Sequence, residues 1–206
     1  APKKVAVVGA GPAGLAAATQ LAERGHHVSL FDSAAEVGGQ FNLARRIPGK
    51  EEFGETLRYF RTRLKDLKVD VQLNRRVTSA DFSGYDHVVV STGIVPRTPD
   101  IPGIDHPKVI SYIDLIEGRK QAGKKVAVIG AGGIGFDVAE FLTHAGDHGD
   151  PIDAYRKEWG IDPAYTEKRG GLAAPQMPET PREVWLLQRK ATKVGDGLAK
   201  TTGWAR

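Results

Sequence analysis

Two glycine-rich loops have the residue types and spacing of a phosphate-binding site. The first spans residues 9–14 and follows the apolar run 5–8, and a near-copy at residues 130–135 follows the apolar run 126–129. In a GxGxxG turn the missing side chains let the backbone approach a pyrophosphate, and the helix that begins there directs its N–H groups and dipole at the negative charge. The two loops therefore predict two dinucleotide-binding sites.

An acidic residue ends the strand expected after the first loop. Asp32 follows the apolar run 28–31 and lies roughly 20 residues beyond the loop, the interval at which a carboxylate accepts hydrogen bonds from adenosine ribose hydroxyls. The alternative is an aspartate that only forms a turn. Gly38-Gly39 and Gln40 follow, where the backbone could approach a pyrophosphate or flavin again and the amide could hydrogen-bond it. These features favour FAD as the ligand of the first loop.

The strand expected after the second loop ends differently. Residues 183–187 are mainly apolar, and Gln188, Arg189 and Lys190 follow them where the first lobe has its acid. A carboxylate there would repel a 2′-phosphate, whereas guanidinium and ammonium groups pair with one. The second loop is therefore predicted to bind NADPH rather than NADH. The alternative is that the two cations only cover a solvated strand end.

The elements around the loops predict an α/β fold with two Rossmann-like dinucleotide-binding lobes. Helices are expected at residues 15–24 and 134–145 after the loops, and at 50–67, where apolar residues recur at helical spacing and the arginines and lysines face solvent. A half-exposed strand is expected at 69–73 and a buried strand at 87–93. A proline-rich passage at 94–107 predicts a crossover between lobes, so residues 1–100 form the FAD lobe and 101–206 the NADPH lobe. Within the latter, a Gly/Pro-rich insertion at 146–181 is expected to make functional or docking contacts.

Composition limits the remaining classes of function. The 206 residues are 40% apolar and 26% charged, which is typical of a globular protein, and the basic residues that give a net charge of +4 are spread along the chain. An anionic cofactor explains this charge better than nucleic acid does. The absence of cysteine excludes a redox disulfide and a thiolate metal site within these residues. Without an apolar run of about 20 residues, the chain is expected to be soluble and cytoplasmic. Trp204 is interpreted either as a docking aromatic or as part of a core.

Several strings resemble bacterial NADPH-dependent 2,4-dienoyl-CoA reductases, and together they cover nearly the whole chain. They are residues 9–14, 30–32, 38–42, 47–53, 93–99, 130–137 and 188–191. In that family an FMN-binding barrel and a 4Fe-4S cluster precede two lobes of this kind. The resemblance implies that electrons pass from NADPH to FAD, through the cluster to FMN, and then to a dienoyl-CoA in the β-oxidation of unsaturated fatty acids.

The resemblance also implies which residues hold the cofactors. Contacts to FAD are expected from Gly9, Gly11, Pro12, Ala13, Gly14, Asp32, Gly39, Gln40, Lys50, the backbone of Val77, Thr92 and Gly93. Contacts to NADPH are expected from Gly130, Gly132, Gly133, Ile134, Arg189 and Lys190. No catalytic or metal-ligating side chain is assigned. The barrel, the cluster cysteines and the last strands of the NADPH lobe are absent from this sequence, so it is expected to be a C-terminally incomplete fragment whose partner is the missing barrel and cluster domain.

Two functions of different class follow from these residues. The first is a flavoprotein oxidoreductase module in which hydride passes from the nicotinamide of NADPH to N5 of FAD. The alternative is a non-catalytic module that holds ADP or FAD structurally, as in related amine dehydrogenases. The pair Arg189-Lys190 argues against the alternative, because a structural adenine site has little use for recognition of a 2′-phosphate.

Overall fold

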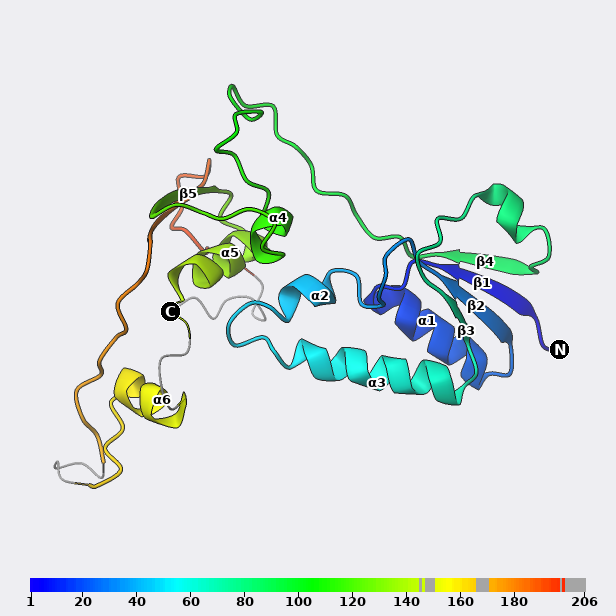
Figure 1. Cartoon of the computed structure of the whole chain (residues 1–206), viewed down its shortest axis with the longest axis horizontal. Helices are drawn as coiled ribbons and strands as arrows, with labels where there is room; N and C mark the ends of the chain where they lie inside the picture. The colour runs from blue at the N-terminus through cyan, green and yellow to red at the C-terminus, as the bar shows by residue number, and fades with distance from the viewer. Residues whose placement is uncertain (145, 147–150, 166–170, 197, 199–206) are drawn as a thin grey trace. The chain divides into compact units, whose positions relative to one another are not determined.

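The structure is a computed structural model and describes residues 1–144, 146, 151–165, 171–196 and 198 (Figure 1). It divides into two compact units, Ala1–Glu117 and Gly118–Arg206. Each unit contains one of the two glycine-rich loops. Trp204 lies outside the described residues.

A parallel four-stranded sheet forms the first unit, with the strand order β3-β2-β1-β4 (Figure 1). The strands are β1 (Lys4–Val8), β2 (His27–Phe31), β3 (Asp70–Gln72) and β4 (His87–Val90). Val5 of β1 pairs with Val28 of β2 on one side and with His87 of β4 on the other. Helices connect β1 to β2 and β2 to β3, as parallel pairing requires. This arrangement confirms the predicted Rossmann-like α/β fold.

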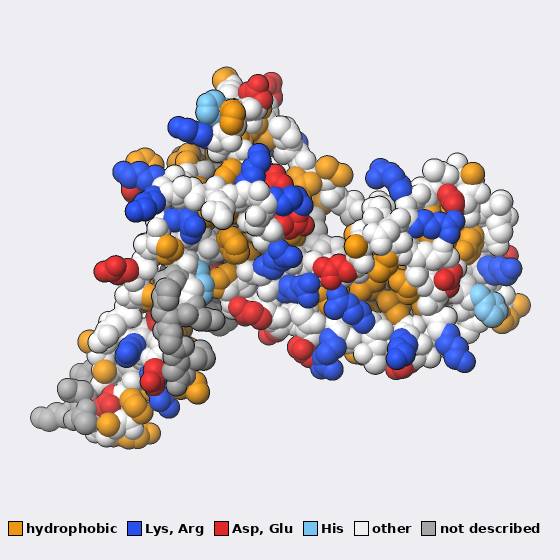
Figure 2. Space-filling model, viewed as in Figure 1, with side chains coloured by type: hydrophobic (Ala, Val, Ile, Leu, Met, Phe, Trp, Pro, Cys, Tyr) orange, Lys and Arg blue, Asp and Glu red, His pale blue; other side chains and the backbone are white. Residues whose placement is uncertain are grey.

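Two helices bury the apolar core of this unit against the sheet. They are α1 (Pro12–Glu23) and α3 (Phe53–Asp66). Leu15 of α1 and Leu57 and Leu64 of α3 are buried together with strand residues such as Val7. Complete burial of a leucine side chain contributes about 1.5–3 kcal/mol, so these contacts fix the helices on the sheet. The opposite face of α3 carries exposed arginines and lysines, as the sequence predicted (Figure 2).

The prediction that the fourth strand is buried is wrong for this structure. Val88 and Val90 of β4 are 40% and 72% exposed. The reason is that β4 lies at the edge of the described sheet, with β1 as its only neighbouring strand there. Its apolar run is typical of a strand covered on both faces, but no described element provides that cover.

The second unit contains a two-stranded parallel sheet. Its strands are β5 (Lys125–Ile129) and β6 (Glu183–Leu187), and Ala127 pairs with Trp185. The helix after the loop is α5 (Gly133–Thr143), which buries Val138 and Leu142. Within the predicted insertion, the structure has a helix that the sequence analysis did not predict, α6 (Pro151–Trp159).

Three further short helices were not predicted from the sequence. They are α2 (Phe41–Ala44), the 3-10 helix Ser79–Phe82 and α4 (Tyr112–Ile116), all in the first unit. Among the described residues, no helix is long and apolar enough to cross a membrane. In the same residues, no group of three His, Asp or Glu side chains could hold a metal ion.

Candidate dinucleotide-binding sites

The first glycine-rich loop is held between the ends of two strands. The N–H of Gly9 donates to the carbonyl oxygen of Phe31, the last residue of β2, at 2.8 Å. Gly9 has a φ of +103°, and a Cβ atom there would overlap the backbone of Ser91 beyond β4. Only glycine therefore fits the first position of the loop.

The other two glycines of the motif have different surroundings. A Cβ atom added at Gly14 would overlap the carbonyl oxygen of Gly9, so this glycine lets α1 pack closely on β1. A Cβ atom added at Gly11 would meet no atom of the described chain within 4 Å, so space remains open beside the second glycine. Pro12 is the first residue of α1, and its fixed φ suits that position. The open position is the one at which a pyrophosphate approaches the backbone.

Asp32 connects the loop to the turn after β2. One carboxylate oxygen accepts a hydrogen bond from the N–H of Ala10 at 2.6 Å, and the other accepts one from Ala34 at 2.8 Å. A carboxylate has about four acceptor positions, so both oxygens retain capacity for the hydroxyls of a ribose. The structure thus shows that Asp32 forms a turn and also contacts the glycine-rich loop. Its contact with a ribose stays a prediction.

The Gly38-Gly39 pair lies against the first loop. Gly38 donates its N–H to the carbonyl of Ala10 at 2.8 Å, and a Cβ atom at Gly39 would lie 3.0 Å from the Cα of Gly11. Two stretches of bare backbone therefore meet beside α1. Backbone without side chains on both segments is what the close approach of a pyrophosphate requires.

Two residues that the sequence analysis did not select also shape this site. The hydroxyl of Ser91 lies 2.9 Å from the carbonyl oxygens of both Val8 and Gly9 and donates to them. The side-chain amide of Asn42 donates to the carbonyl of Val37 at 3.1 Å, while its buried Oδ1 has no hydrogen-bond partner in the described chain. An unsatisfied buried acceptor is rare and calls for a donor, and the hydroxyl groups of a flavin dinucleotide supply such donors. The position of Ser91 at a strand end was the only sequence signal for its role.

The remaining predicted contacts of the first unit lie in loops around the sheet. Gln40 precedes α2, with its side chain exposed, and half-buried Lys50 lies in the turn before α3. Val77 follows the segment in which the N–H of Arg75 donates to the carbonyl of Asp32 at 2.9 Å. Thr92 and Gly93 follow β4 and are exposed, as Ala13 is at the start of α1. Their contacts with FAD stay predictions.

The second loop repeats the geometry of the first. Gly130 has a φ of +117° and donates its N–H to the carbonyl of Leu187, the last residue of β6, at 2.9 Å. A Cβ atom at Gly135 would overlap the carbonyl oxygen of Gly130, whereas one at Gly132 would meet no described atom within 4 Å. Gly133 and Ile134 begin α5. The two loops are thus structural counterparts, each with one crowded helix glycine and one open glycine.

Cationic side chains follow the second strand of this unit. Arg189 and Lys190 are both exposed and come directly after half-buried Gln188. Within the described part of the chain, neither residue forms an ion pair. Among these described residues, an anionic group can therefore pair with them without first breaking an ion pair.

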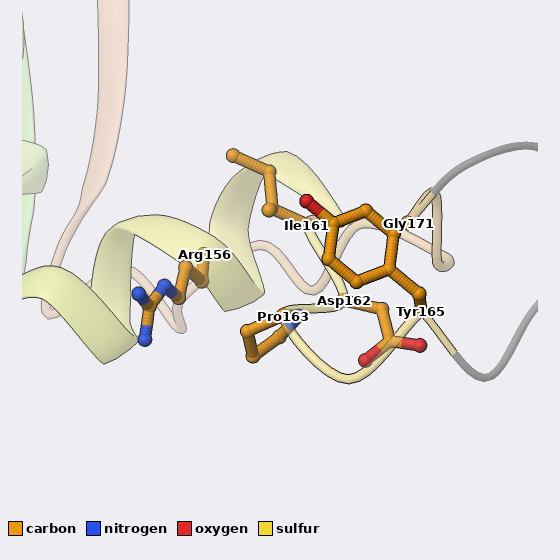
Figure 3. A pocket seen from close by; sticks show the side chains of 6 residues that line it. All are labelled: Arg156, Ile161, Asp162, Pro163, Tyr165 and Gly171. Atoms are coloured by element: carbon orange, nitrogen blue, oxygen red, sulfur yellow. The ribbon is translucent and has the colours of Figure 1, made fainter.

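A cavity of about 320 Å³ lies elsewhere in the second unit, between α6 and the segment that follows it (Figure 3). Its lining consists of Arg156, Ile161, Asp162, Pro163, Tyr165 and Gly171. None of these residues belongs to the glycine-rich loops. The guanidinium of Arg156 is paired with Asp153 at 3.3 Å, so its charge is already partly neutralised.

The family of the chain follows from comparison with known proteins. The model of the pyridine nucleotide-disulphide oxidoreductase family matches residues 3–158, which include both loops. The chain belongs to this family. Members of the pyridine nucleotide-disulphide oxidoreductase family bind FAD and NAD(P)H, and the chain is accordingly an oxidoreductase module of the flavoprotein type. The open Gly11, the carboxylate of Asp32 and the unsatisfied Oδ1 of Asn42 fit a flavin dinucleotide at the first loop.

Several similar proteins are much longer than this chain. A metal reductase of Desulforamulus reducens is 36% identical over 151 residues, which are 70% of this chain and 23% of that protein. The structure of a 2-naphthoyl-CoA reductase in complex with 2-naphthoyl-CoA is 35% identical, with a TM-score of 0.66, and the match covers 69% of this chain and 22% of that one. A 6-hydroxypseudooxynicotine amine oxidase of Pseudomonas geniculata N1 is 34% identical, with a TM-score of 0.59 and coverage of 67% and 23%. The chain spans less than a quarter of these relatives.

Proposed function

We propose that the chain is the electron-input module of a larger NADPH-dependent reductase. In this proposal the first unit binds FAD and the second unit binds NADPH. When both cofactors are bound, they supply the redox chemistry, a hydride transfer from the nicotinamide to the flavin. The residues of the chain bind and orient the two cofactors, and none of them is assigned as an acid, base or nucleophile.

The observation that carries the proposal is the repetition of one loop geometry beside two strand ends of opposite charge. Gly9 and Gly130 each donate an N–H to the last residue of the second strand of their own loop region, β2 or β6, and Gly11 and Gly132 leave the same open position. Next to the first loop stands the carboxylate of Asp32, which suits ribose hydroxyls. The cationic side chains of Arg189 and Lys190 follow β6 in the second unit and suit a 2′-phosphate.

We further propose 2,4-dienoyl-CoA reduction in the β-oxidation of unsaturated fatty acids as the reaction of the whole protein. The strings that resemble that family support this proposal, as does the similarity to a relative named 2-naphthoyl-CoA reductase. The partner of the module is then an FMN-binding barrel with a 4Fe-4S cluster, through which electrons reach the acyl-CoA. Reduction of dienoyl-CoA is expected only when that domain is present.

Flavin binding and reduction test the proposal directly. The purified chain, mixed with FAD and then freed of unbound cofactor, is expected to retain a flavin absorption band that NADPH bleaches under anaerobic conditions. NADH is expected to bleach it less efficiently, because it lacks the 2′-phosphate. A chain that retains no flavin, or a bound flavin that NADPH does not reduce, would contradict the proposal.

A structural nucleotide-binding module is the second candidate function. It is supported by the similarity to an amine oxidase and to an N,N-dimethylglycine/sarcosine dehydrogenase of Chromohalobacter salexigens, which is 37% identical over 134 residues. This candidate predicts no preference between NADPH and NADH. Arg189→Ala discriminates the two candidates, since it is expected to weaken NADPH binding only if the second loop recognises the 2′-phosphate.

A further inference from the structure

The turn after β6 is closed by a single side chain. The amide of Gln188 donates from Nε2 to the carbonyl oxygen of Lys190 at 3.0 Å and also to the carbonyl oxygen of Thr192. Both partners are acceptors, so the amide must face them with its NH₂ group. Residues 188–192 are thereby folded into a tight loop around the Gln188 side chain.

The counterpart turn in the first unit has the opposite polarity. Phe31 and Leu187 accept the same loop N–H, so Asp32 and Gln188 hold equivalent positions after their strands. Asp32 accepts hydrogen bonds from backbone N–H groups, whereas Gln188 donates to backbone carbonyls. In the first turn the N–H of Ala34 therefore points toward the side chain that follows the strand, whereas in the second turn the carbonyl oxygens of Lys190 and Thr192 do.

The orientation of these carbonyl oxygens changes what the second turn presents to an anion. A carbonyl oxygen repels a phosphate, so holding the oxygens of Lys190 and Thr192 on the Gln188 amide removes two repulsive groups from the approach. The side chains of Arg189 and Lys190 are left exposed on the same turn. A glutamate at position 188 could not hold these two carbonyl groups, because it has no donor and would face both of them with negative charge.

We propose that Gln188 is a positioning residue that shapes the turn for recognition of a 2′-phosphate by Arg189 and Lys190. This inference rests on the proposed binding of NADPH at the second loop. Gln188 does not itself contact the phosphate. It acts through the conformation of the two residues that do, and it should therefore affect selectivity for the 2′-phosphate more than binding of the adenosine.

Two nucleotides that differ only in the 2′-phosphate isolate this effect. Titration calorimetry on the 206-residue chain would compare 2′,5′-ADP with 5′-AMP, and the ratio of their dissociation constants reports the recognition of that one group. In Gln188→Leu, which removes the donors without adding charge, the preference for 2′,5′-ADP is expected to fall roughly tenfold, the size of a lost charge-assisted contact. Gln188→Glu is expected to lower it further. Gln121→Glu, an exposed position of the same unit, makes the same change of charge and is expected to leave the preference unchanged.

The outcomes separate this inference from the function on which it rests. If Gln188→Leu weakens both nucleotides equally, the residue is merely structural and the inference is wrong. If Arg189→Ala with Lys190→Ala abolishes the preference while Gln188→Leu keeps it, NADPH binding stands and only the role of Gln188 is refuted. If the unaltered chain binds the two nucleotides equally, the assignment of NADPH fails and the inference fails with it.

Discussion

The glycines of each loop divide between folding and binding, and a pair of single substitutions separates the two roles. Gly14→Ala would force a methyl group onto the carbonyl oxygen of Gly9, backbone that cannot move without displacing α1 from β1. Overpacking of this kind costs about 1–3 kcal/mol or more. The free energy of unfolding of the first unit is therefore expected to fall by at least about 2 kcal/mol, as measured by urea denaturation followed by circular dichroism.

Gly11→Ala is the matched control. Its φ of −74° suits alanine, and the added methyl group would meet no described atom. Gly11 is the N-cap of α1, where alanine is less favourable than glycine, so stability without cofactor is expected to fall by up to about 1 kcal/mol, less than in Gly14→Ala. Affinity for FAD is expected to fall sharply, because the methyl group fills the space that the pyrophosphate needs. If both variants lose the same stability, the close contact between position 14 and the carbonyl oxygen of Gly9 is not the reason that Gly14 is needed for folding.

Asp32 is expected to stabilise the fold even without a ligand. Its two oxygens accept hydrogen bonds from Ala10 and Ala34, and asparagine has one acceptor oxygen where aspartate has two. Asp32→Asn is therefore expected to lower the free energy of unfolding of the cofactor-free chain by about 1–2 kcal/mol, the cost of an unsatisfied backbone donor. Thermal and urea unfolding of apo protein measure this. If the stability is unchanged, the two hydrogen bonds of Asp32 do not stabilise the fold, and its role is limited to contact with the cofactor.

At the scale of the elements, the sequence best predicted those helices and strands whose formation depends on residues that are close together in the chain. The apolar runs and loop glycines predicted β1, α1, β2, β5, α5 and β6. Hydrophobic periodicity and the residue types of a turn are both properties of neighbouring residues. The exposure of β4 depends on which elements cover the sheet, and no pattern within its own residues records that. The helix α6 was missed because the surrounding glycines and prolines dominated the interpretation of its segment.

The same distinction applies to the candidate sites. The loop glycines and the acidic or basic residues that follow each second strand could be predicted from the sequence, because the motif has fixed spacing. Ser91 could not, since its hydroxyl contacts Val8, which is far away in the sequence. Asn42 contacts nearby Val37, but no sequence pattern shows that its Oδ1 is buried without a partner in the described chain. The orientation of Gln188 was also beyond prediction, because an amide can donate or accept and only its neighbours decide which.

The start of β1 is tied to β4 by a carboxylate that should titrate in acid. Asp86 precedes β4 and accepts the N–H of Lys4 at 2.8 Å, and this hydrogen bond holds the pKa of the Asp86 carboxyl below its ordinary value. The unfolded chain then binds more protons between the two pKa values, so the stabilisation is complete above about pH 4 and is lost as the pH falls through the lower, folded pKa.

Asp86→Asn tests this contact by its pH dependence. The difference in unfolding midpoint between the parent chain and Asp86→Asn is expected to be constant from pH 7 to about pH 5 and to shrink below about pH 4. Chemical denaturation at a series of pH values measures it. Asp100→Asn, at an exposed position with no resolved interaction in the described chain, serves as the control. A difference that persists unchanged into strong acid would contradict ionisation of Asp86 as its source.

At the scale of the whole molecule, the chain combines two units with very different cores. The buried hydrophobic cluster lies entirely within the first unit, in which two helices cover a four-stranded sheet. In the described part of the second unit, Val138 and Leu142 are the buried large hydrophobics, and Ile129 and Trp185 on its two strands are 63% and 59% exposed. A two-stranded sheet alone is marginally stable, so the second unit should open far more often than the first unit.

Amide hydrogen exchange can measure this difference in one experiment. The amides of β1 and α1 are expected to be protected at least about tenfold more strongly than those of β5 and α5, because a difference of 1.4 kcal/mol in opening free energy already gives that ratio. Saturating NADPH should raise protection in β5 and α5 selectively, since a ligand at about 100 times its dissociation constant adds roughly 2.7 kcal/mol to the state that binds it. Equal protection in both units would mean that they unfold as one cooperative body. Protection that NADPH raises only around the first loop would mean that the two loops have been assigned to the wrong dinucleotides.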